Sequence, residues 1–285
     1  MPAQLLHFEK MHGCGNDYIY IDCFTQQVED PAALAIRLSD RHKGVGGDGV
    51  ILVCPPEDPA HDGRMRMFNL DGSQGKMCGN GIRCVAKFLY DHGYAPKPAL
   101  LIETLSGVKT CTIHAQGDLC TAVTVDMGAA ILEPTAIPVA LPGPAVIDRE
   151  VDLAGGRHRI TCVSMGNPHC VIFQDADPMT LDLERIGPSF EHDPLFPESV
   201  NTEFIRVIDD HTLQMRVWER GSGETLACGT GACASAVAAV LCGRCPKGEP
   251  ITVRLRGGDL TVTYTDATVL MTGEAVTVFT GCVTL

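Results

Sequence analysis

Cys78-Gly79-Asn80-Gly81 and Cys228-Gly229-Thr230-Gly231 are two copies of one motif, separated by 228 − 78 = 150 positions. Three more short matches occur in the same order along the chain. Met65–Asn69 resembles Met215–Glu219 and Leu105–Gly107 resembles Leu255–Gly257, both at offset 150, and Gly15-Asn16 resembles Gly166-Asn167 at offset 151. Several ordered matches at one offset are the signature of an internal repeat. The sequence therefore predicts an ancestral duplication.

The duplication predicts two domains of similar fold in a chain of 285 residues, because half of that length is an ordinary domain size. We expect the first domain to comprise residues 1–126 and 274–285 and to carry Cys78. We expect the second to comprise residues 127–273 and to carry Cys228.

The local pattern within each half is mostly that of β-strands. Short runs rich in β-branched residues end at Gly, Asp or Pro; they are Tyr18–Asp22, Val50–Val53, Ala122–Val125, Ile160–Val163, Val171–Phe173, Thr252–Leu255 and Leu260–Tyr264. Two segments are typical of buried helices, Gly81–His92 and Gly231–Cys242, and each is followed by a glycine. A weaker helix is expected over Pro31–His42. The predicted fold class is α/β in the broad sense (α+β), with two homologous halves related by a pseudo-twofold axis. Each half is a curved, mainly antiparallel sheet around a central helix.

Composition excludes several classes of protein. Lys and Arg total 22 against 35 Asp and Glu, a net charge of −13, which is unsuited to neutralising nucleic-acid phosphates. No apolar stretch reaches the length of a membrane span, and the first residues do not read as a signal peptide. We therefore expect a cytoplasmic protein with a small-molecule substrate and no nucleic-acid or membrane partner. In that compartment the 14 cysteines stay reduced, and most of them are expected to pack in the core.

The two repeated loops suggest thiol chemistry, because each lies immediately before a predicted helix. A helix N-terminus has unsatisfied N–H groups and a partial positive charge, so it binds a carboxylate and favours a thiolate. Placed there, the pKa of Cys78 or Cys228 is expected to fall towards neutrality. Two such thiols on opposite faces of one carbon could invert it, one removing its proton and the other returning a proton.

Five longer motifs resemble the diaminopimelate epimerase family. They are M-H-G-C-G-N-D-Y (11–18), D-R-H-K-G-V-G-G-D-G (40–49), F-N-L-D-G-S-Q-G-K-M-C-G-N-G-I-R-C (68–84), S-M-G-N-P-H-C (164–170) and W-E-R-G-S-G-E-T-L-A-C-G-T-G-A-C (218–233). The resemblance runs essentially end to end. It implies a cofactor-independent enzyme, with no metal, that interconverts LL- and meso-diaminopimelate on the route to lysine and peptidoglycan. It also implies two similar halves with the site in a cleft between them, and a homodimer.

The resemblance also implies roles for individual residues. Cys78 and Cys228 match the acid–base pair, in which the first is usually written as the proton donor and the second as the acceptor. His169 matches a histidine near the thiols that is thought to assist them, so it and Glu219 are counted with the thiols as catalytic residues. The other matches are Gly79-Asn80 and Gly229-Thr230 for the reacting carboxylate; Asn16, Asn69, Asn167 and Asn201 lining the cleft; and Glu219 and Arg220 for the ammonium and carboxylate of the distant L-centre. A planar Arg fork suits a carboxylate better than Lys does.

Three positions depart from the family pattern. Cys14 stands where an aliphatic residue is expected, Leu70 replaces a smaller residue, and Gly49 lies where some members have a substrate-contacting Gln. None of these removes a catalytic group, but they leave fine specificity and an additional oxidisable thiol open.

Two other motifs resemble cofactor or metal sites without their context. Gly44–Gly49 fits G-x-G-x-x-G but precedes a predicted strand rather than a helix. Cys242–Cys245 is a C-x-x-C with no second pair or nearby His to complete a zinc site. Two alternative functions stay open at this point: a racemase of another amino acid on the same scaffold, or a non-catalytic zinc or redox thiol protein.

Overall fold

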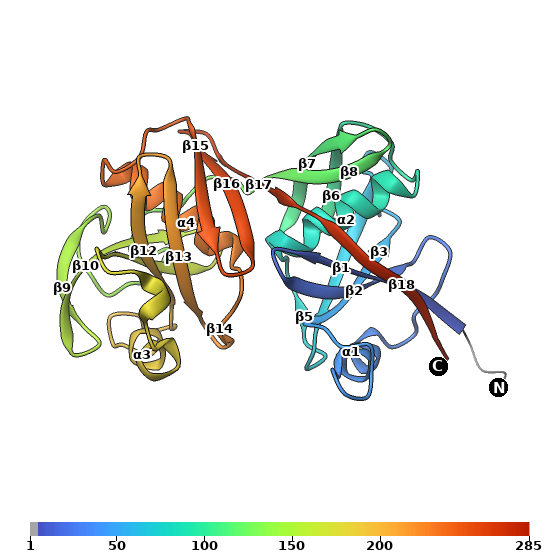
Figure 1. Ribbon diagram of the computed structural model, residues 1–285, viewed down its shortest axis with the longest axis horizontal. Helices are drawn as coiled ribbons and strands as arrows, with labels where there is room; N and C mark the ends of the chain where they lie inside the picture. Colours follow the sequence, from blue (N-terminus) through green and yellow to red (C-terminus); the bar gives the residue numbers. More distant parts are fainter. Residues whose placement is uncertain (1–4, 285) are drawn as a thin grey trace. The chain divides into compact units, whose positions relative to one another are not determined.

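The computed structural model describes residues 5–284, and its contacts divide the chain into two compact units. Unit 1 is Met1–Asp126 with Thr272–Leu285, and unit 2 is Met127–Met271. Both are drawn in Figure 1. None of the helices within residues 5–284 is long and apolar enough to cross a membrane.

Unit 1 contains two helices and most of the first nine strands. Its strands are β1 (Leu5–Gly13), β2 (Asn16–Asp22), β3 (Gly49–Cys54), β4 (Gly63–Asn69), β5 (Gln74–Gly75), β6 (Ala99–Thr104), β7 (Gly107–Gln116), β8 (Leu119–Asp126) and, from the end of the chain, β18 (Val276–Thr284). Its helices are α1 (Pro31–Ser39) and α2 (Gly79–Asp91). Strands β2 and β3 are parallel, as are β4 and β6, whereas β1–β2, β1–β18, β3–β4, β4–β5, β6–β7 and β7–β8 are antiparallel.

Unit 2 repeats much of this arrangement. Its strands are β9 (Arg149–Leu153), β10 (Gly156–Ser164), β11 (Pro168–Phe173), β12 (Asn201–Asp209), β13 (Thr212–Glu219), β14 (Gly223–Glu224), β15 (Pro250–Leu255) and β16 (Gly258–Tyr264), with β17 (Val269–Glu274) leading into unit 1. Its helices are α3 (Leu183–Glu191), α4 (Gly229–Leu241) and a 3₁₀ turn at Pro178–Thr180.

The duplication predicted from the sequence is visible in the order and direction of the elements. The parallel pairs β11–β12 and β13–β15 of unit 2 correspond to β2–β3 and β4–β6 of unit 1. Helix α4 lies 150 positions after α2, and both have 13 residues. In each unit the sheet surrounds the central helix, as Figure 1 shows for α2 and α4 separately. The predicted α+β class is confirmed.

Both central helices begin two residues earlier than predicted. The sequence pattern placed their starts at Gly81 and Gly231, because the apolar residues typical of a buried helix begin directly after these glycines. In the structure Cys78 and Cys228 are the N-cap residues, with extended backbones and sulfur atoms that accept from the amides of Gly81 and Gly231. The first glycine of each motif therefore already belongs to the helix.

The other two helices show where local patterns mislead. Helix α1 ends at Ser39 instead of His42, because the Asp40 carboxylate accepts from the amides of His42 and Lys43 and turns the chain. Helix α3 was not predicted, since Gly187 and Pro188 lie inside it. Burial of the apolar side of α3 in the core of unit 2, through Leu183 among others, outweighs their poor helix propensity.

Candidate functional site

Cys78 is half-buried at the start of α2 in unit 1. Its Sγ lies 3.3 Å from the amide nitrogen of Gly81 and 3.2 Å from Oδ1 of Asn16. Asn16 is held in turn by Asp48, whose Oδ2 accepts from the Asn16 Nδ2 at 2.6 Å. The Cys78 thiol therefore has a fixed direction, set by the helix start and by one side-chain amide.

Arg83 anchors the first turn of α2 from below. The side chain is fully buried and donates to the carbonyl of Gly79 at 3.1 Å, to Oδ1 of Asn80 at 2.9 Å and to the carbonyl of Glu274 at 3.1 Å. The Asn80 side chain is thus turned into the protein to bind Arg83. The backbone amide of Asn80, at the helix start, is therefore better placed to bind a carboxylate than its side chain is.

The remaining predicted positions of unit 1 vary in their surroundings. The Asn69 amide donates to the Ser73 hydroxyl at 3.0 Å. Cys14, with a positive φ of 54°, is buried and accepts from Arg83 at 3.6 Å, so its thiol is directed into the protein. Gly49 begins β3, and a Cβ there would lie 2.1 Å from the Phe68 carbonyl oxygen. This backbone therefore has no room for the Gln that some family members carry.

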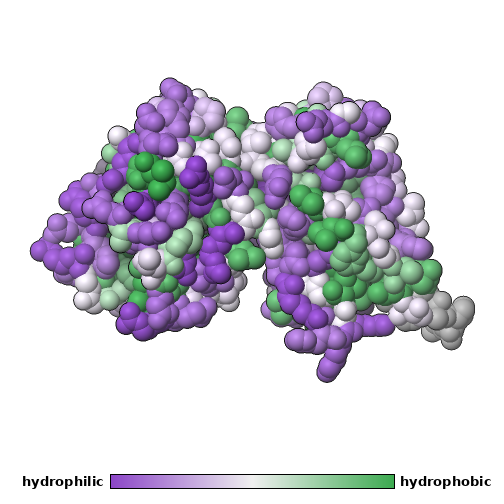
Figure 2. Space-filling model, viewed as in Figure 1, coloured by the Kyte–Doolittle hydropathy of each residue, from purple (hydrophilic) through white to green (hydrophobic). Residues whose placement is uncertain are grey.

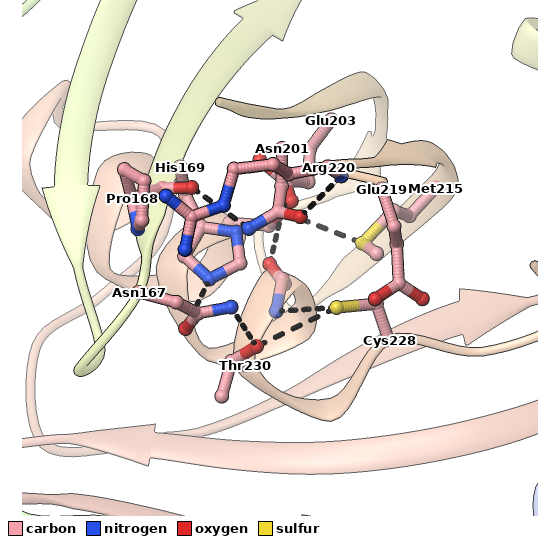
Figure 3. Close-up of polar contacts among 12 residues, drawn as sticks. Asn167, Pro168, His169, Asn201, Glu203, Met215, Glu219, Arg220, Cys228 and Thr230 are labelled. Carbon is pink, nitrogen blue, oxygen red and sulfur yellow. Dashed lines mark hydrogen bonds and ion pairs between the residues drawn. The ribbon is translucent and has the colours of Figure 1, made fainter. Parts of the chain in front are cut away.

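Cys228 has the corresponding place in unit 2 but a more enclosed setting. It is only 4% exposed, and its Sγ lies 3.4 Å from the Gly231 amide and 3.5 Å from the Thr230 hydroxyl. Figure 3 shows it between the start of α4 and the carboxylate of Glu219, at the end of β13.

Glu219 lies directly beside this thiol. Its carboxylate makes hydrogen bonds with Cys228 and with the Thr225 hydroxyl. Burial raises the pKa of Glu219 above its usual value, although these two hydrogen bonds oppose the rise. Burial, together with the charges of Glu219 and Glu203, raises the pKa of Cys228 well above that of a free thiol. The lowered pKa expected for this thiol from its helix position is therefore wrong for Cys228, because desolvation and two carboxylates outweigh the helix N-terminus.

His169 and Glu203 form a wholly buried pair below the site. Glu203 Oε1 lies 2.7 Å from His169 Nδ1, and both side chains are 0% exposed. The other ring nitrogen lies 3.0 Å from Oδ1 of Asn167, and the Asn167 amide donates to the Thr230 hydroxyl at 3.3 Å. Figure 3 shows this chain of contacts leading to the start of α4. Both ring nitrogens of His169 are therefore engaged within the protein, and the contacts link Glu203 through His169 and Asn167 to Thr230.

Asn201 and Arg220 are joined to one another rather than directed at the thiol. Asn201 donates to the Pro168 carbonyl at 2.8 Å and accepts from the Arg220 backbone amide at 2.8 Å. The Arg220 guanidinium donates to the Glu198 carbonyl at 3.0 Å. Glu219 and Arg220, neighbours in sequence, thus serve different places: the first contacts Cys228, and the second extends to the surface.

Sequence reasoning missed three residues that hold the site. They are Asp48, which fixes Asn16; Arg83, which fixes the first turn of α2; and Glu203, which fixes His169. Only Glu203 gave a usable signal, as an acidic residue in an otherwise uncharged, β-rich run, Asn201–Ile205.

Neither of the two motifs that resemble cofactor or metal sites, Gly44–Gly49 and Cys242–Cys245, forms such a site. Gly44–Gly49 leads directly into strand β3, so it lacks the helix start that a dinucleotide fingerprint needs. Cys242 caps the end of α4, 3.3 Å from the Thr161 hydroxyl, and burial raises the pKa of Cys245 to about 11.

Comparison with known proteins gives one consistent result. The family model described as diaminopimelate epimerase matches residues 8–133 and 161–278. A diaminopimelate epimerase of Acetivibrio thermocellus is 50% identical over 283 residues, covering 98% of this chain and 99% of the relative. One from Desulfovibrio desulfuricans is also 50% identical, covering 98% of each. Among solved structures, a Bacillus anthracis phenazine biosynthesis protein of the PhzF family aligns with a TM-score of 0.71 at 18% identity, covering 99% of this chain and all of the other, so it shows a shared fold.

Proposed function

This chain belongs to the diaminopimelate epimerase family and converts LL-diaminopimelate to meso-diaminopimelate, and we propose that Cys78 and Cys228 are the two groups that move the proton. The observation that supports this assignment most directly is their equivalence. Each thiol caps the 13-residue central helix of its unit and accepts from the amide of the glycine three positions on. No other cysteine pair of the chain has matching positions in both units.

The chemistry requires two groups because the reacting carbon changes configuration. A thiolate removes the α-proton from one face, the negative charge passes onto the α-carboxylate, and a thiol delivers a proton to the other face. We propose that the first-turn amides at Gly79-Asn80 and Gly229-Thr230 bind that carboxylate, since N–H groups at a helix start have no acceptor within the helix and favour negative charge. In the reverse direction the two thiols exchange roles.

The surroundings of Cys228 favour its protonated state when no substrate is bound. Burial and the Glu219 charge favour the thiol over the thiolate. A substrate ammonium group bound near Glu219 would offset that charge, so Cys228 would lose its proton only once substrate is present. The hydrogen bond between Cys228 and Glu219 provides the path for that proton. This gives Glu219 both a binding and a catalytic role.

The remaining site residues are assigned binding and positioning roles. We propose that Asn16, Asn69, Asn167 and Asn201 surround the polar substrate, that Arg220 binds the distant carboxylate, and that His169 orients Asn167. The buried Glu203 fixes the ring of His169. These side chains supply proton transfer and charge recognition by themselves, which is what a cofactor-independent epimerisation needs.

Two substitutions and one isotope experiment test the assignment. Cys78→Ser and Cys228→Ser are each expected to abolish epimerisation and leave the circular dichroism spectrum unchanged. Near-normal turnover by either variant would disprove the two-base scheme. In D₂O, starting from either isomer, deuterium is expected early in the product but not in recovered substrate. Equal early labelling of both would indicate a single base.

We also propose that the protein is a homodimer and that β18 supplies the contact. On this strand Val278 and Phe279 are 55% and 46% exposed, and Leu5 on the adjoining β1 is 53% exposed. Figure 2 shows hydrophobic residues gathered in this part of unit 1. A second copy with the same uncharged strand offers an equivalent apolar surface, as a twofold contact requires.

Light scattering during gel filtration tests the dimer. Phe279→Arg is expected to give a monomer, because a buried guanidinium in the contact would lack a partner. Leu119→Arg, at another exposed leucine of unit 1, is the matched control and is expected to remain dimeric. A dimer that persists in Phe279→Arg places the contact elsewhere.

For localisation we propose the cytoplasm, with no nucleic-acid or membrane partner. The mechanism needs reduced thiols, and the cytoplasm maintains them. Fractionation of cells that produce the tagged protein tests this, since recovery in a membrane fraction would contradict it.

A further inference from the structure

A second pair of thiols lies in unit 1, away from the helix that Cys78 caps. Cys23 directly follows β2 and Cys54 ends β3, one residue beyond the parallel register pair Asp22–Val53. The backbone amide of Cys23 still donates to the carbonyl of Val53, at 2.9 Å. Neighbouring strands are about 4.8 Å apart, and a disulfide spans Cα separations of about 4.4–6.8 Å. The two cysteines therefore stand at a spacing that a disulfide can close.

The side chains of the two cysteines interact electrostatically. Their side chains share a hydrogen bond, which raises the pKa of Cys23 and lowers the pKa of Cys54 to about 7. The shared proton therefore favours ionisation of Cys54 over ionisation of Cys23.

Two arginines on β4 stabilise that charge. Arg64 is the direct antiparallel partner of Cys54, and Arg66 is the partner of Leu52, two residues earlier on the same face of β3. Both guanidinium groups lower the pKa of Cys54 by their charge, and Arg64 also makes a side-chain hydrogen bond with it. The acidic groups nearby are Asp22, which raises the pKa of Cys23, and Glu57, which pairs with Arg64. Glu29 lines the cavity that borders the pair, and Glu103 lies close enough to Arg64 for that charge to lower the pKa of Glu103.

A cavity of about 310 Å³ borders this pair, in which Cys23 is half-buried and Cys54 is 5% exposed. It is lined by both thiols, both arginines and residues of the following loop, including Gln26 and Glu29. The buried Nε of Arg64 has no hydrogen-bond acceptor within residues 5–284, so this guanidinium keeps an unused donor beside the cavity. A cation-stabilised thiolate that borders a cavity, next to a second thiol, is an arrangement that reacts with oxidants.

We propose that Cys23 and Cys54 form a second thiol site, in which Cys54 reacts with a hydroperoxide and Cys23 then closes a disulfide. With hydrogen peroxide, the Cys54 thiolate attacks one oxygen, the S–O bond forms, the O–O bond breaks, and the hydroxide that leaves takes up a proton to become water. Cys23 then attacks the sulfur of the sulfenic acid, and the S–S bond forms as the S–O bond breaks, releasing a second water. In total two thiols are oxidised and one peroxide is reduced to two waters.

Unit 2 contains a natural control for this reaction. Cys162 and Cys170 are direct partners on β10 and β11, so they are equally close in the fold. Both are 0% exposed, and burial raises the pKa of Cys170 well above its usual value, with Cys162, Glu203 and Asp193 adding to the rise. Proximity alone would make both pairs react, whereas thiolate charge and access select Cys23 and Cys54.

The experiment is peroxide titration of the reduced full-length protein with a readout at each cysteine. Samples are alkylated at intervals without prior reduction, digested and analysed by mass spectrometry, which separates this pair from Cys78 and Cys228. A linked Cys23–Cys54 peptide is expected, forming at least about tenfold faster than any Cys162–Cys170 link. If the two pairs react at equal rates, or Cys23 and Cys54 are oxidised without becoming linked, the proposal is wrong.

Three variants separate the steps. Cys23→Ser is expected to stop at a sulfenic acid on Cys54 that dimedone traps. Cys54→Ser is expected to leave Cys23 unoxidised and epimerase activity unchanged. Arg66→Gln is expected to slow the reaction several-fold at pH 7, since a rise of one pKa unit in the thiol reduces the thiolate up to about tenfold. An unchanged rate in Arg66→Gln would contradict activation by the arginines, and persistent oxidation of Cys23 in Cys54→Ser would reverse the assignment of the nucleophile.

Discussion

Replacing Gly231 by alanine tests whether the buried carboxylate of Glu203 holds the active site in place. A Cβ at this position would lie 2.7 Å from Glu203 Oε1, 3.2 Å from Met215 Cε and 3.3 Å from the Cys228 Cβ. The thiol, Glu219 and the substrate-binding groups all remain present in this variant. Any loss of activity therefore reports on position and not on missing chemistry.

The expected size of the effect follows from these distances. Ordinary Cβ contacts begin at 3.4 Å, so the carboxylate oxygen must withdraw by about 3.4 − 2.7 = 0.7 Å. Glu203 Oε1 is the atom that contacts His169 at 2.7 Å, and a comparable lengthening takes that contact outside the usual N–H···O range of about 2.7–3.2 Å and weakens it. Losing a charge-assisted hydrogen bond costs about 1.5–3 kcal/mol, and alanine in place of a helical glycine returns about 0.5–1 kcal/mol. The net loss of stability is therefore about 0.5–2.5 kcal/mol.

Gly81→Ala is the matched control at the equivalent position of unit 1. Its Cβ would meet Ile51 Cδ1 at 2.7 Å and Met65 Cε at 3.0 Å, which are the ends of flexible apolar side chains. Repacking there has a similar cost, about 1–3 kcal/mol, but no polar contact to the catalytic groups is displaced. The two variants are therefore expected to lose similar stability and to differ in catalysis.

The assay measures both quantities on the same preparations. Calorimetry is expected to show a Tm lowered by about 2–8 °C for each variant. Chiral chromatography of the two diaminopimelate isomers gives the rate. We expect kcat to fall about 10- to 100-fold in Gly231→Ala, since a misplacement near 1 Å is that costly, and to stay within about threefold in Gly81→Ala. Equal kcat losses in both variants, or a full rate in Gly231→Ala, would refute the role given to Glu203.

Three further predictions concern charge. Glu203→Gln is expected to lower the pKa of Cys228, because one of the two carboxylates that raise it loses its charge; alkylation of Cys228 by iodoacetamide should then begin at lower pH. Asp17→Asn is expected to destabilise the protein only above about pH 4. Burial opposes ionisation of Asp17, but Arg41 and Lys10 hold its pKa below the usual 3.8, so the stabilisation is complete above that value and disappears as pH falls through the folded-state pKa. Urea midpoints at pH 3 and 7 measure the difference. Arg83→Lys is expected to cost about 2–3 kcal/mol of unfolding free energy in urea titrations, because an ammonium group cannot reproduce the three buried contacts of the guanidinium fork.

Much of the fold was predictable because its signals are local. The strands over Tyr18–Asp22 and Thr252–Leu255 follow from β-branched runs between turn residues, and the central helices follow from apolar spacing. The exact starts of the central helices could not be predicted, since a cysteine at an N-cap looks the same in sequence as a cysteine in a turn. Helix α3 was missed because its stability comes from packing against β12 and β13, which local propensity does not describe.

The positions of the site residues were predictable to a similar extent. The repeat singled out Cys78 and Cys228, and the family resemblance added the residues around them. The sequence did not show that Glu219 contacts Cys228 while Arg220 extends away from it, because β13 ends at Glu219 and Arg220 already lies in the turn that follows. Nor did it show Asp48 as the partner of Asn16, since 32 positions separate them.

The sequence by itself determined the duplication, the fold class, the family and the pair of thiols, because these depend on residue identity and on spacing along the chain. The tertiary structure decided the electrostatic state of each thiol. Cys228 is buried beside two carboxylates, so it retains its proton, whereas Cys54 lies beside two arginines and a second thiol, so it loses its proton readily. The local motif distinguishes Cys228 from Cys54, but its place at a helix start predicted a lowered pKa, the opposite of what the fold produces. The pKa of a thiol depends on which charges the fold brings near it and on how much water it removes, and both are properties of the folded chain alone.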